Sequence, residues 1–175
     1  MTIRLRAAEA ADGPALARIY APAVLHGTAS FEVDPPSPEE MARRLAAIRA
    51  EGLPWLVAER AEIVVGYAYA GRYRTRPAYR WTVEDSVYVL PAEQGTGIGR
   101  ALLAALLDAC TELGFRQMVA VIGDSASEGS IRLHRSMGFE HAGQVRSVGF
   151  KHGRWLDQVL MQRPLGDGDR LPPRA

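Results

Sequence analysis

The chain has 175 residues and a single cysteine, Cys110, which fits one domain and excludes an intrachain disulfide framework. Its formal net charge of +1 argues against a dedicated nucleic-acid-binding protein, because such proteins carry a marked basic excess. The sequence contains no run of about 18 apolar residues and begins without the apolar core of a signal peptide. We therefore expect a cytoplasmic protein without nucleic-acid or membrane partners.

Apolar patterning divides the chain into strands and helices. Strands are predicted where residues alternate or where a short apolar run is bounded by turns: 3–6, 55–59, 63–69, 82–90, 118–122, 140–150 and 154–162. Helices are predicted where capping signals precede an amphipathic pattern: 14–25, 38–50, 97–113 and 127–137. This order, β-α-α-β-β-β-α-β-α-β-β, is typical of an α/β domain.

Capping and turn residues set several boundaries. Asp12 can cap the first helix, and Ser37 followed by Pro38 can begin the second. The proline-rich stretch 28–38 between these helices should be a loop. The last residues, 164–175, are rich in Gly, Pro and Asp, so we expect a flexible tail after a single domain over 1–163.

The segment from Pro91 to Arg100 joins a predicted strand to a predicted helix and reads Pro-Ala-Glu-Gln-Gly-Thr-Gly-Ile-Gly-Arg. Backbone N–H groups at a helix start lack partners, and glycine allows close approach, so the segment predicts a cradle for phosphate or pyrophosphate. It contains no Gly-Lys pair for a Walker loop, and Arg100 stands where a dinucleotide fingerprint needs glycine. Gln94-x-x-Gly97-x-Gly99 remains. The alternative is a glycine-rich turn without a ligand.

That pattern resembles the acetyl-CoA loop of the GNAT superfamily of N-acetyltransferases. Residues 130–139, Ser-Ile-Arg-Leu-His-Arg-Ser-Met-Gly-Phe, are similar to the family's helix signature S-x-x-L-[YH]-x-x-x-G-F. Segments 30–32, 81–84, 86–89 and 149–153 resemble the branch that acetylates phosphinothricin (glufosinate) and methionine sulfoximine. The resemblance covers residues 2–163. It implies a GNAT fold, with a mixed central sheet of about seven strands flanked by about four helices.

The resemblance also implies acetyl-CoA as co-substrate, no metal, and a set of residues that hold acetyl-CoA. These are Val87, Tyr88, Val89, Gln94, Gly95, Thr96, Gly97, Ile98, Gly99, Arg100 and Ser127. The first three would run beside the pantetheine arm, where a backbone N–H can polarise the thioester carbonyl. Ser127 stands where the family usually has asparagine, and its side chain has a shorter reach.

Two residues are candidates for catalysis. Glu84 matches the acidic residue that the resembled branch uses as the base for the incoming amine. Because side chains alternate along a strand, Glu84 and Asp85 should face opposite sides of the sheet. His134 lies in the helix signature and is the candidate acid for the leaving thiolate. The alternatives are an ion pair between Glu84 and an arginine, and a packed or solvated His134.

The arginine-rich segment 72–80 is predicted to select the acceptor. By motif position, Arg74, Arg76 and Tyr79 would contact the carboxylate of an amino-acid-like substrate, and Phe31 would form a wall of the pocket. The alternative is a solvated loop. Lys151 and His152 are expected to close the pocket, either from the same subunit or from the second subunit of a homodimer, which the resemblance implies.

The predicted function is therefore acetyl transfer from acetyl-CoA to the α-amine of phosphinothricin, methionine sulfoximine or methionine sulfone, by direct attack in a ternary complex. One alternative is a GNAT enzyme for protein N-termini or polyamines, although arginines disfavour a polycation. The other is a CoA-binding sensor without turnover, because a fold alone does not fix function.

Overall fold

A mixed sheet of seven strands organises the computed structural model, which describes residues 2–173. The strands are β1 (Arg4–Ala7), β2 (Trp55–Arg60), β3 (Ile63–Arg72), β4 (Thr82–Val89), β5 (Gln117–Gly123), β6 (Glu140–Lys151) and β7 (Arg154–Pro164). Their order across the sheet is β1-β2-β3-β4-β5-β7-β6. Neighbouring strands are antiparallel except β4 and β5, whose parallel pairing requires a crossover connection. The predicted mixed α/β sheet is confirmed.

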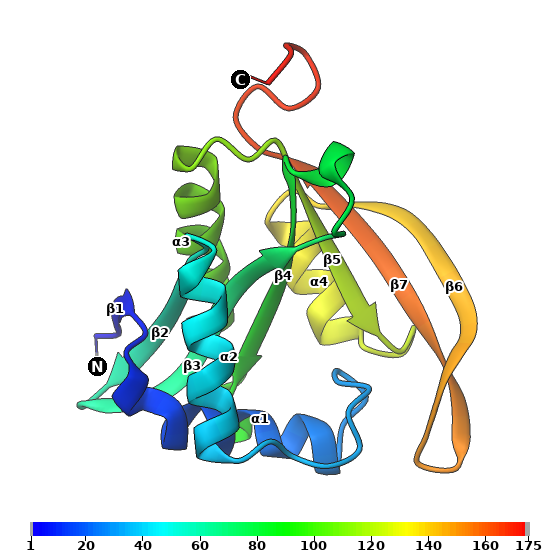
Figure 1. Cartoon of the computed structure of the whole chain (residues 1–175). Helices are drawn as coiled ribbons and strands as arrows, with labels where there is room; N and C mark the ends of the chain where they lie inside the picture. Colours follow the sequence, from blue (N-terminus) through cyan, green and yellow to red (C-terminus); the bar gives the residue numbers. More distant parts are fainter. Residues whose placement is uncertain (1, 174–175) are drawn as a thin grey trace.

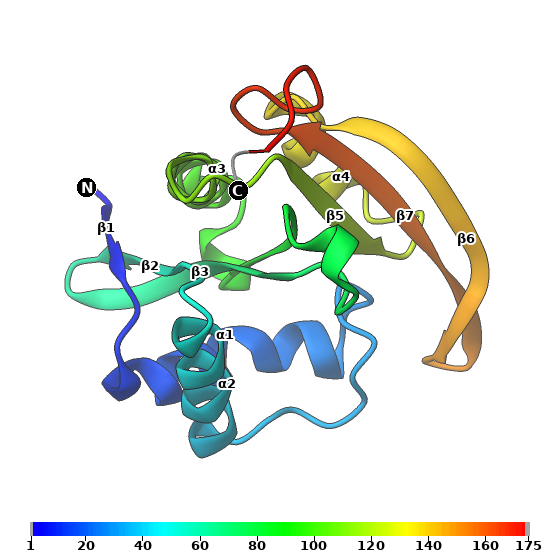
Figure 2. The same cartoon turned by 45° about the horizontal axis from the view of Figure 1, so that its top comes forward.

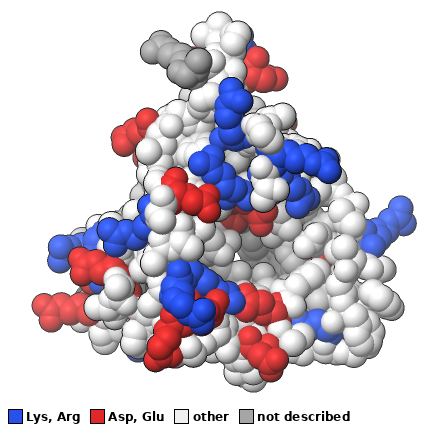
Figure 3. All heavy atoms as spheres, viewed as in Figure 1, with Lys and Arg blue, Asp and Glu red and all other residues white. Residues whose placement is uncertain are grey.

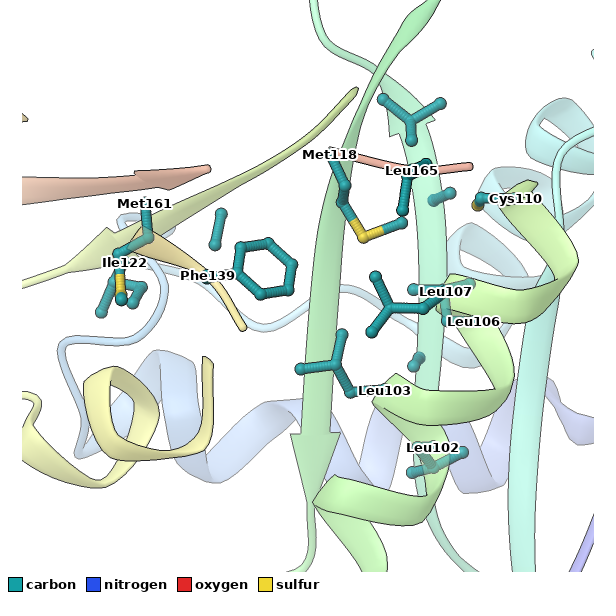
Figure 4. Close-up of a cluster of buried hydrophobic side chains, with 14 of the residues drawn as sticks. Leu102, Leu103, Leu106, Leu107, Cys110, Met118, Ile122, Phe139, Met161 and Leu165 are labelled. Carbon is teal, nitrogen blue, oxygen red and sulfur yellow. The ribbon is translucent and has the colours of Figure 1, made fainter. Parts of the chain in front are cut away.

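Helices cover both faces of this sheet (Figure 2). One face carries α1 (Gly13–Leu25) and α2 (Pro38–Ala50), and the other carries α3 (Ile98–Glu112) and α4 (Glu128–Ser136). The crossover from β4 to β5 is α3, whose leucines point into the core beside Met118 and Phe139 (Figure 4). Burying a leucine side chain contributes roughly 1.5–3 kcal/mol. The α3 packing therefore fixes the position of the loop that precedes this helix.

Of the two predicted helix caps, at α1 and α2, one is observed in the structure. Ser37 caps α2 as expected, because its hydroxyl oxygen accepts a hydrogen bond from the Glu40 N–H at 3.2 Å. Asp12 precedes α1 but does not cap it with its side chain. Its carboxylate instead accepts hydrogen bonds from the Glu9 N–H at 2.7 Å and from Arg6 at 2.8 Å. An ion pair between the half-buried Arg6 and the buried Asp12 thus replaces the expected cap.

The domain boundary differs from the expected one at residue 163. Strand β7 ends at Pro164, and Leu165 is buried in the core between the sheet and α3. Arg116 donates hydrogen bonds to Asp167 at 3.1 Å and to the Leu171 carbonyl at 2.8 Å. The packed unit therefore extends past residue 163, while residues 174–175 of the expected tail lie outside the described part. No helix within residues 2–173 is long and apolar enough to cross a membrane.

Candidate active site

An opening in the sheet between β4 and β5 forms the centre of the site. The two strands pair from Thr82 opposite Gln117 to Asp85 opposite Ala120, where the pairing described for residues 2–173 stops. Both strands continue, and Figure 1 shows them diverging towards their C-terminal ends. Backbone N–H and C=O groups at such an edge need hydrogen-bond partners. An extended ligand that contains amide groups can supply them in the manner of an added strand.

A cavity of about 60 Å³ lies at this opening. It is lined by residues 85–88 of β4, residues 120–123 of β5, and Ser127, Ser130 and His134 at α4. Val87 and Val89 pack their side chains towards the core beside α3, whereas the Tyr88 ring packs 5.3 Å from Tyr67 on the opposite face. The backbone of Val87 and Tyr88 borders the opening, while the side chains of Val87, Tyr88 and Val89 hold the strand in the fold.

The predicted anion cradle lies between the end of β4 and α3. Gly95 and Gly97 have φ angles of +74° and +90°, a region that disfavours residues with a Cβ. A Cβ added to either glycine would meet no atom within 4 Å, so the space beside their backbone is open. Gly97 is the N-cap of α3, and the first N–H groups of this helix lack intrahelical partners. The loop thus has the form that binds anions at a helix start.

Other residues of the cradle serve the fold as well. Gln94 donates a hydrogen bond to the Val89 carbonyl at 3.3 Å, and Thr96 donates its hydroxyl hydrogen to the Glu93 carbonyl at 2.7 Å. The Ile98 side chain is buried in the core, so only its backbone faces the cradle. Of the other two residues predicted for the cradle, Gly99 packs against α4, and the side chain of Arg100 is exposed.

Ser127 lies at the start of α4 and lines the cavity. Its hydroxyl donates to the Gly123 carbonyl at 2.7 Å, which links the end of β5 to α4. Because a hydroxyl oxygen retains its lone pairs after donating, Ser127 can still accept a hydrogen bond from a ligand.

Asp85 and His134 form a buried pair at the inner wall of the cavity. His134 Nε2 lies 2.9 Å from Asp85 Oδ2, and His134 Nδ1 lies 2.8 Å from the Ser130 carbonyl oxygen. His134 is 4% exposed and Asp85 is 6% exposed. Burial works against the charged imidazolium, but the hydrogen bond and charge of Asp85 outweigh it, so the pKa of His134 is raised. His134 is therefore packed against Asp85 rather than solvated.

Glu84 lies on the opposite face of β4, as strand alternation predicted. It is half-buried and shares that face with Tyr69 of β3. Burial, and then the charge of Asp85, raises the pKa of Glu84, while the charge of Arg74 opposes the shift. A carboxylate with a raised pKa is a better proton acceptor than an ordinary one.

The arginine-rich segment between β3 and β4 lies above a hollow in the face shown in Figure 3, where Lys and Arg side chains gather. Arg74 is exposed and stacks 4.8 Å from the Tyr73 ring, and its charge reaches Glu84. Tyr79 packs edge-on against the same Tyr73 ring at 5.8 Å, and Arg76 is exposed at the start of a 3₁₀ turn. The structure thus brings Arg74 towards Glu84.

A second, larger cavity of about 240 Å³ lies between α2 and the sheet on the Glu84 face. Trp55 and Tyr69 stack at 4.2 Å in its lining, and Arg44 of α2 also lines it. Arg44 is held by Glu32 at 2.7 Å. Periodicity identified these aromatic residues only as strand positions, because their common cavity depends on the packing of α2.

Phe31 and Lys151 connect the loop after α1 to the far end of the sheet. The Phe31 ring occupies the space beside Gly149, where an added Cβ would lie 2.4 Å from the ring. Lys151 is buried and donates to the Ser30 carbonyl of its own chain at 2.7 Å, and His152 contacts the Gly27 carbonyl at 3.1 Å. Within this chain, Phe31 packs between strands, and the hairpin residues fasten the loop that carries it.

Asp85 is the residue that sequence reasoning left without a role. Alternation placed it on the face opposite Glu84, and a buried carboxylate almost always has a partner. The expected burial of Asp85 could therefore have predicted a cationic or hydrogen-bonding partner, and His134 was the candidate on α4. No group of three or more His, Cys, Asp or Glu side chains within residues 2–173 is arranged to hold a metal ion.

Known proteins match nearly the whole chain in sequence and in structure. A family model described as an acetyltransferase (GNAT) domain matches residues 5–160. Phosphinothricin N-acetyltransferase from Alcaligenes faecalis is 52% identical over 162 residues, which cover 93% of this chain and 82% of that protein. L-methionine sulfoximine/L-methionine sulfone acetyltransferase from Salmonella typhimurium is 43% identical over 167 residues, covering 95% and 96%. The crystal structure of a GNAT superfamily phosphinothricin acetyltransferase from Sinorhizobium meliloti in complex with AcCoA has a TM-score of 0.95 and 51% identity, covering 99% of this chain and 94% of that one.

Proposed function

This chain belongs to the GNAT family of acetyltransferases, and from that premise we propose that it transfers the acetyl group of acetyl-CoA to the α-amine of a small amino-acid analogue. The expected acceptors are phosphinothricin, methionine sulfoximine and methionine sulfone, which appear in the names of relatives. The observation that carries the proposal is the β4–β5 opening, with a glycine cradle at the end of β4 and Glu84 on the other face of that strand.

The residues present fit acetyl-CoA. Open space beside Gly95 and Gly97 would admit a pyrophosphate to the N–H groups of residues 95–100, and exposed Arg100 would add charge. The free edges of residues 86–89 and 121–123 would pair with the amide groups of the pantetheine arm. When bound, acetyl-CoA supplies an acetyl group activated as a thioester. A backbone N–H near Val87 would stabilise negative charge on the thioester oxygen.

Glu84 is proposed as the base. An α-amine is mostly protonated at neutral pH and must lose a proton before it can attack. Because the pKa of Glu84 is raised by burial and by Asp85, the carboxylate holds a proton more readily than an exposed glutamate. His134 is proposed to assist the departing sulfur from the wall of the 60 Å³ cavity.

Direct attack in a ternary complex is supported by the cysteine. Cys110 is buried in α3, and burial raises the pKa of its thiol to about 12. A thiol in this state is a poor nucleophile, because the thiolate is the reactive form. The geometry thus favours transfer straight from acetyl-CoA to the amine.

The carboxylate of the acceptor is assigned to Arg74 and Arg76, with Tyr79 beside them, because guanidinium groups bind carboxylates through paired N–H donors. The charge of Arg74 reaches Glu84, so an α-carboxylate bound there would bring the α-amine towards the base. Phe31 is assigned to a pocket wall, held in place by the Lys151 contact to Ser30.

A homodimer is part of the proposal. Large apolar side chains are exposed on the β6–β7 ribbon, namely Val145, Val148, Phe150 and Trp155, and the last two rings lie 5.3 Å apart. The Phe150 and Trp155 rings thus form an exposed apolar pair, and exposed apolar surface of this kind is typical of an interaction surface. Sedimentation of the wild type and of Trp155→Asp should show a dimer and a monomer, respectively. A monomeric wild type would contradict this part.

The deciding experiment measures thiol release from acetyl-CoA with phosphinothricin, methionine sulfoximine, methionine sulfone, spermidine and an N-terminal peptide. We expect turnover only with the three amino-acid analogues. Turnover confined to the peptide or to spermidine would retain the cofactor site and overturn the acceptor assignment. CoA binding without turnover of any acceptor would favour a sensor.

A further inference from the structure

The proton positions on His134 follow from its two partners. A carbonyl oxygen only accepts hydrogen bonds, so the 2.8 Å contact with Ser130 places a proton on Nδ1. Asp85 Oδ2 lies 2.9 Å from Nε2, and a carboxylate likewise only accepts. Donation from Nε2 to a carboxylate, together with donation from Nδ1 to the carbonyl, requires a proton on each ring nitrogen, which is the imidazolium form.

The surroundings make this charge state depend on Asp85. Among residues 2–173, Asp85 Oδ1 is buried and has no hydrogen-bond partner, so the carboxylate relies on His134 for compensation. Cys110 approaches Asp85 from α3, and burial and then Asp85 raise its pKa to about 12, so the thiol stays neutral. Glu84 lies on the other face of β4 with a raised pKa. Without Asp85, burial alone would favour neutral His134.

We propose that Asp85 is a positioning residue that keeps His134 protonated at the wall of the β4–β5 cavity, so that the histidine meets the departing sulfur as a cation. The inference rests on the proposed function, because it assigns the sulfur to this cavity. A fixed positive charge in a buried site stabilises a developing thiolate more strongly than it would in water. His134 then acts through its charge, while Asp85 acts through His134.

Nitrogen NMR of the wild-type enzyme without substrates is the first test. At pH 7.5, we expect both ring nitrogens of His134 to carry protons, with a titration midpoint above the usual value of about 6.5. The signal is identified by its loss in His134→Gln. An unprotonated Nε2 at pH 7.5 would mean a neutral imidazole, which would overturn the proposal. This test needs no Asp85 variant to fold.

Asp85→Asn is the second test, with Asp12→Asn as the matched control. Asp12 is also a buried carboxylate paired with a cation, Arg6, and it lies away from the site. In Asp85→Asn, we expect the His134 midpoint to fall below about 6.5 and kcat at pH 8 to fall about tenfold, with smaller loss at pH 6 where the imidazole regains its proton. Asp85→Glu should restore part of kcat. Asp12→Asn should lower only stability.

The outcomes separate this inference from the proposed function. Equal loss of kcat by Asp85→Asn at pH 6 and pH 8 would indicate a merely structural role and overturn the inference. If the wild type turns over no acceptor, the proposed function fails, and the NMR result then decides whether Asp85 keeps His134 protonated.

Discussion

The two faces of β4 place adjacent carboxylates in opposite circumstances. Asp85 is buried, lies 2.9 Å from His134 and borders a cavity of about 60 Å³. Glu84 is half-buried beneath the arginine-rich segment, on the face that carries a cavity of about 240 Å³. One strand therefore supplies carboxylates with two different chemistries. A carboxylate paired with a cation holds that cation in place, whereas one deprived of water without such a partner takes up protons more readily.

Glu84→Gln should have the largest effect on catalysis. We expect kcat to fall about 100-fold or more at neutral pH, because the amide cannot accept the ammonium proton, with the KM for acetyl-CoA little changed. Steady-state kinetics against Glu51→Gln, a surface carboxylate paired with Arg72, provides the control. Retained activity in Glu84→Gln would remove Glu84 from the mechanism.

The same variant gives a pH signature. Since the pKa of Glu84 is raised, its base form is present above that pKa, and wild-type kcat/KM should fall as pH falls through it. The folded state also favours the protonated carboxyl, so this stabilising preference is lost as pH rises through the raised pKa. In Glu84→Gln, the fall of kcat/KM at acidic pH should therefore be smaller. At pH values above the pKa of Glu84, this variant should gain stability relative to the wild type. If the decrease of kcat/KM at acidic pH is the same in Glu84→Gln as in the wild type, another group must cause it.

Arg74→Ala sharpens the assignment of the Glu84 face to the acceptor. Loss of a charge-assisted hydrogen bond to a carboxylate should raise the acceptor KM about tenfold, with the KM for acetyl-CoA unchanged. Arg80→Ala is the matched control, because Arg80 stacks 5.2 Å from the Trp81 ring and has no assigned acceptor contact. If both substitutions raise the acceptor KM equally, residues 72–80 would act only as a general basic surface and not through a specific contact of Arg74.

Gly97→Ala tests the cradle on the cofactor side. A Cβ at φ +90° should destabilise the fold by about 1–2 kcal/mol and raise the KM for acetyl-CoA several-fold. Gly52→Ala, at φ +73° in the turn after α2, should lower the free energy of urea unfolding by a similar amount without changing that KM. Parallel behaviour of the two variants would leave the cradle without a role in binding.

Cys110→Ala should have the smallest effect on catalysis. The thiol lies in the core and its pKa is about 12, so kcat should stay within about twofold while unfolding becomes easier by about 1 kcal/mol. Mass spectrometry during turnover provides the direct measurement. An acetyl group on Cys110 would refute direct attack in a ternary complex.

Sequence reasoning succeeded where neighbours along the chain decide structure. Alternation placed Glu84 and Asp85 on opposite faces, and the Gly97 signal placed the start of α3. The prediction was wrong at Asp12, whose carboxylate accepts a hydrogen bond from Arg6 instead of capping a helix. A local capping signal cannot show that a cation from a neighbouring strand competes for the same oxygen.

The amino-acid sequence was enough to predict the order of elements, the glycine turn before α3, and the placement of Glu84 and Asp85 on opposite faces of β4. Periodicity, caps and backbone freedom act over only a few residues. Three features follow only from the three-dimensional packing: the end of β4–β5 pairing at Asp85, the contact of His134 with Asp85 across 49 residues of sequence, and the attachment of the Phe31 loop by Lys151. These contacts depend on how distant elements pack, and packing is fixed by the burial of the whole core.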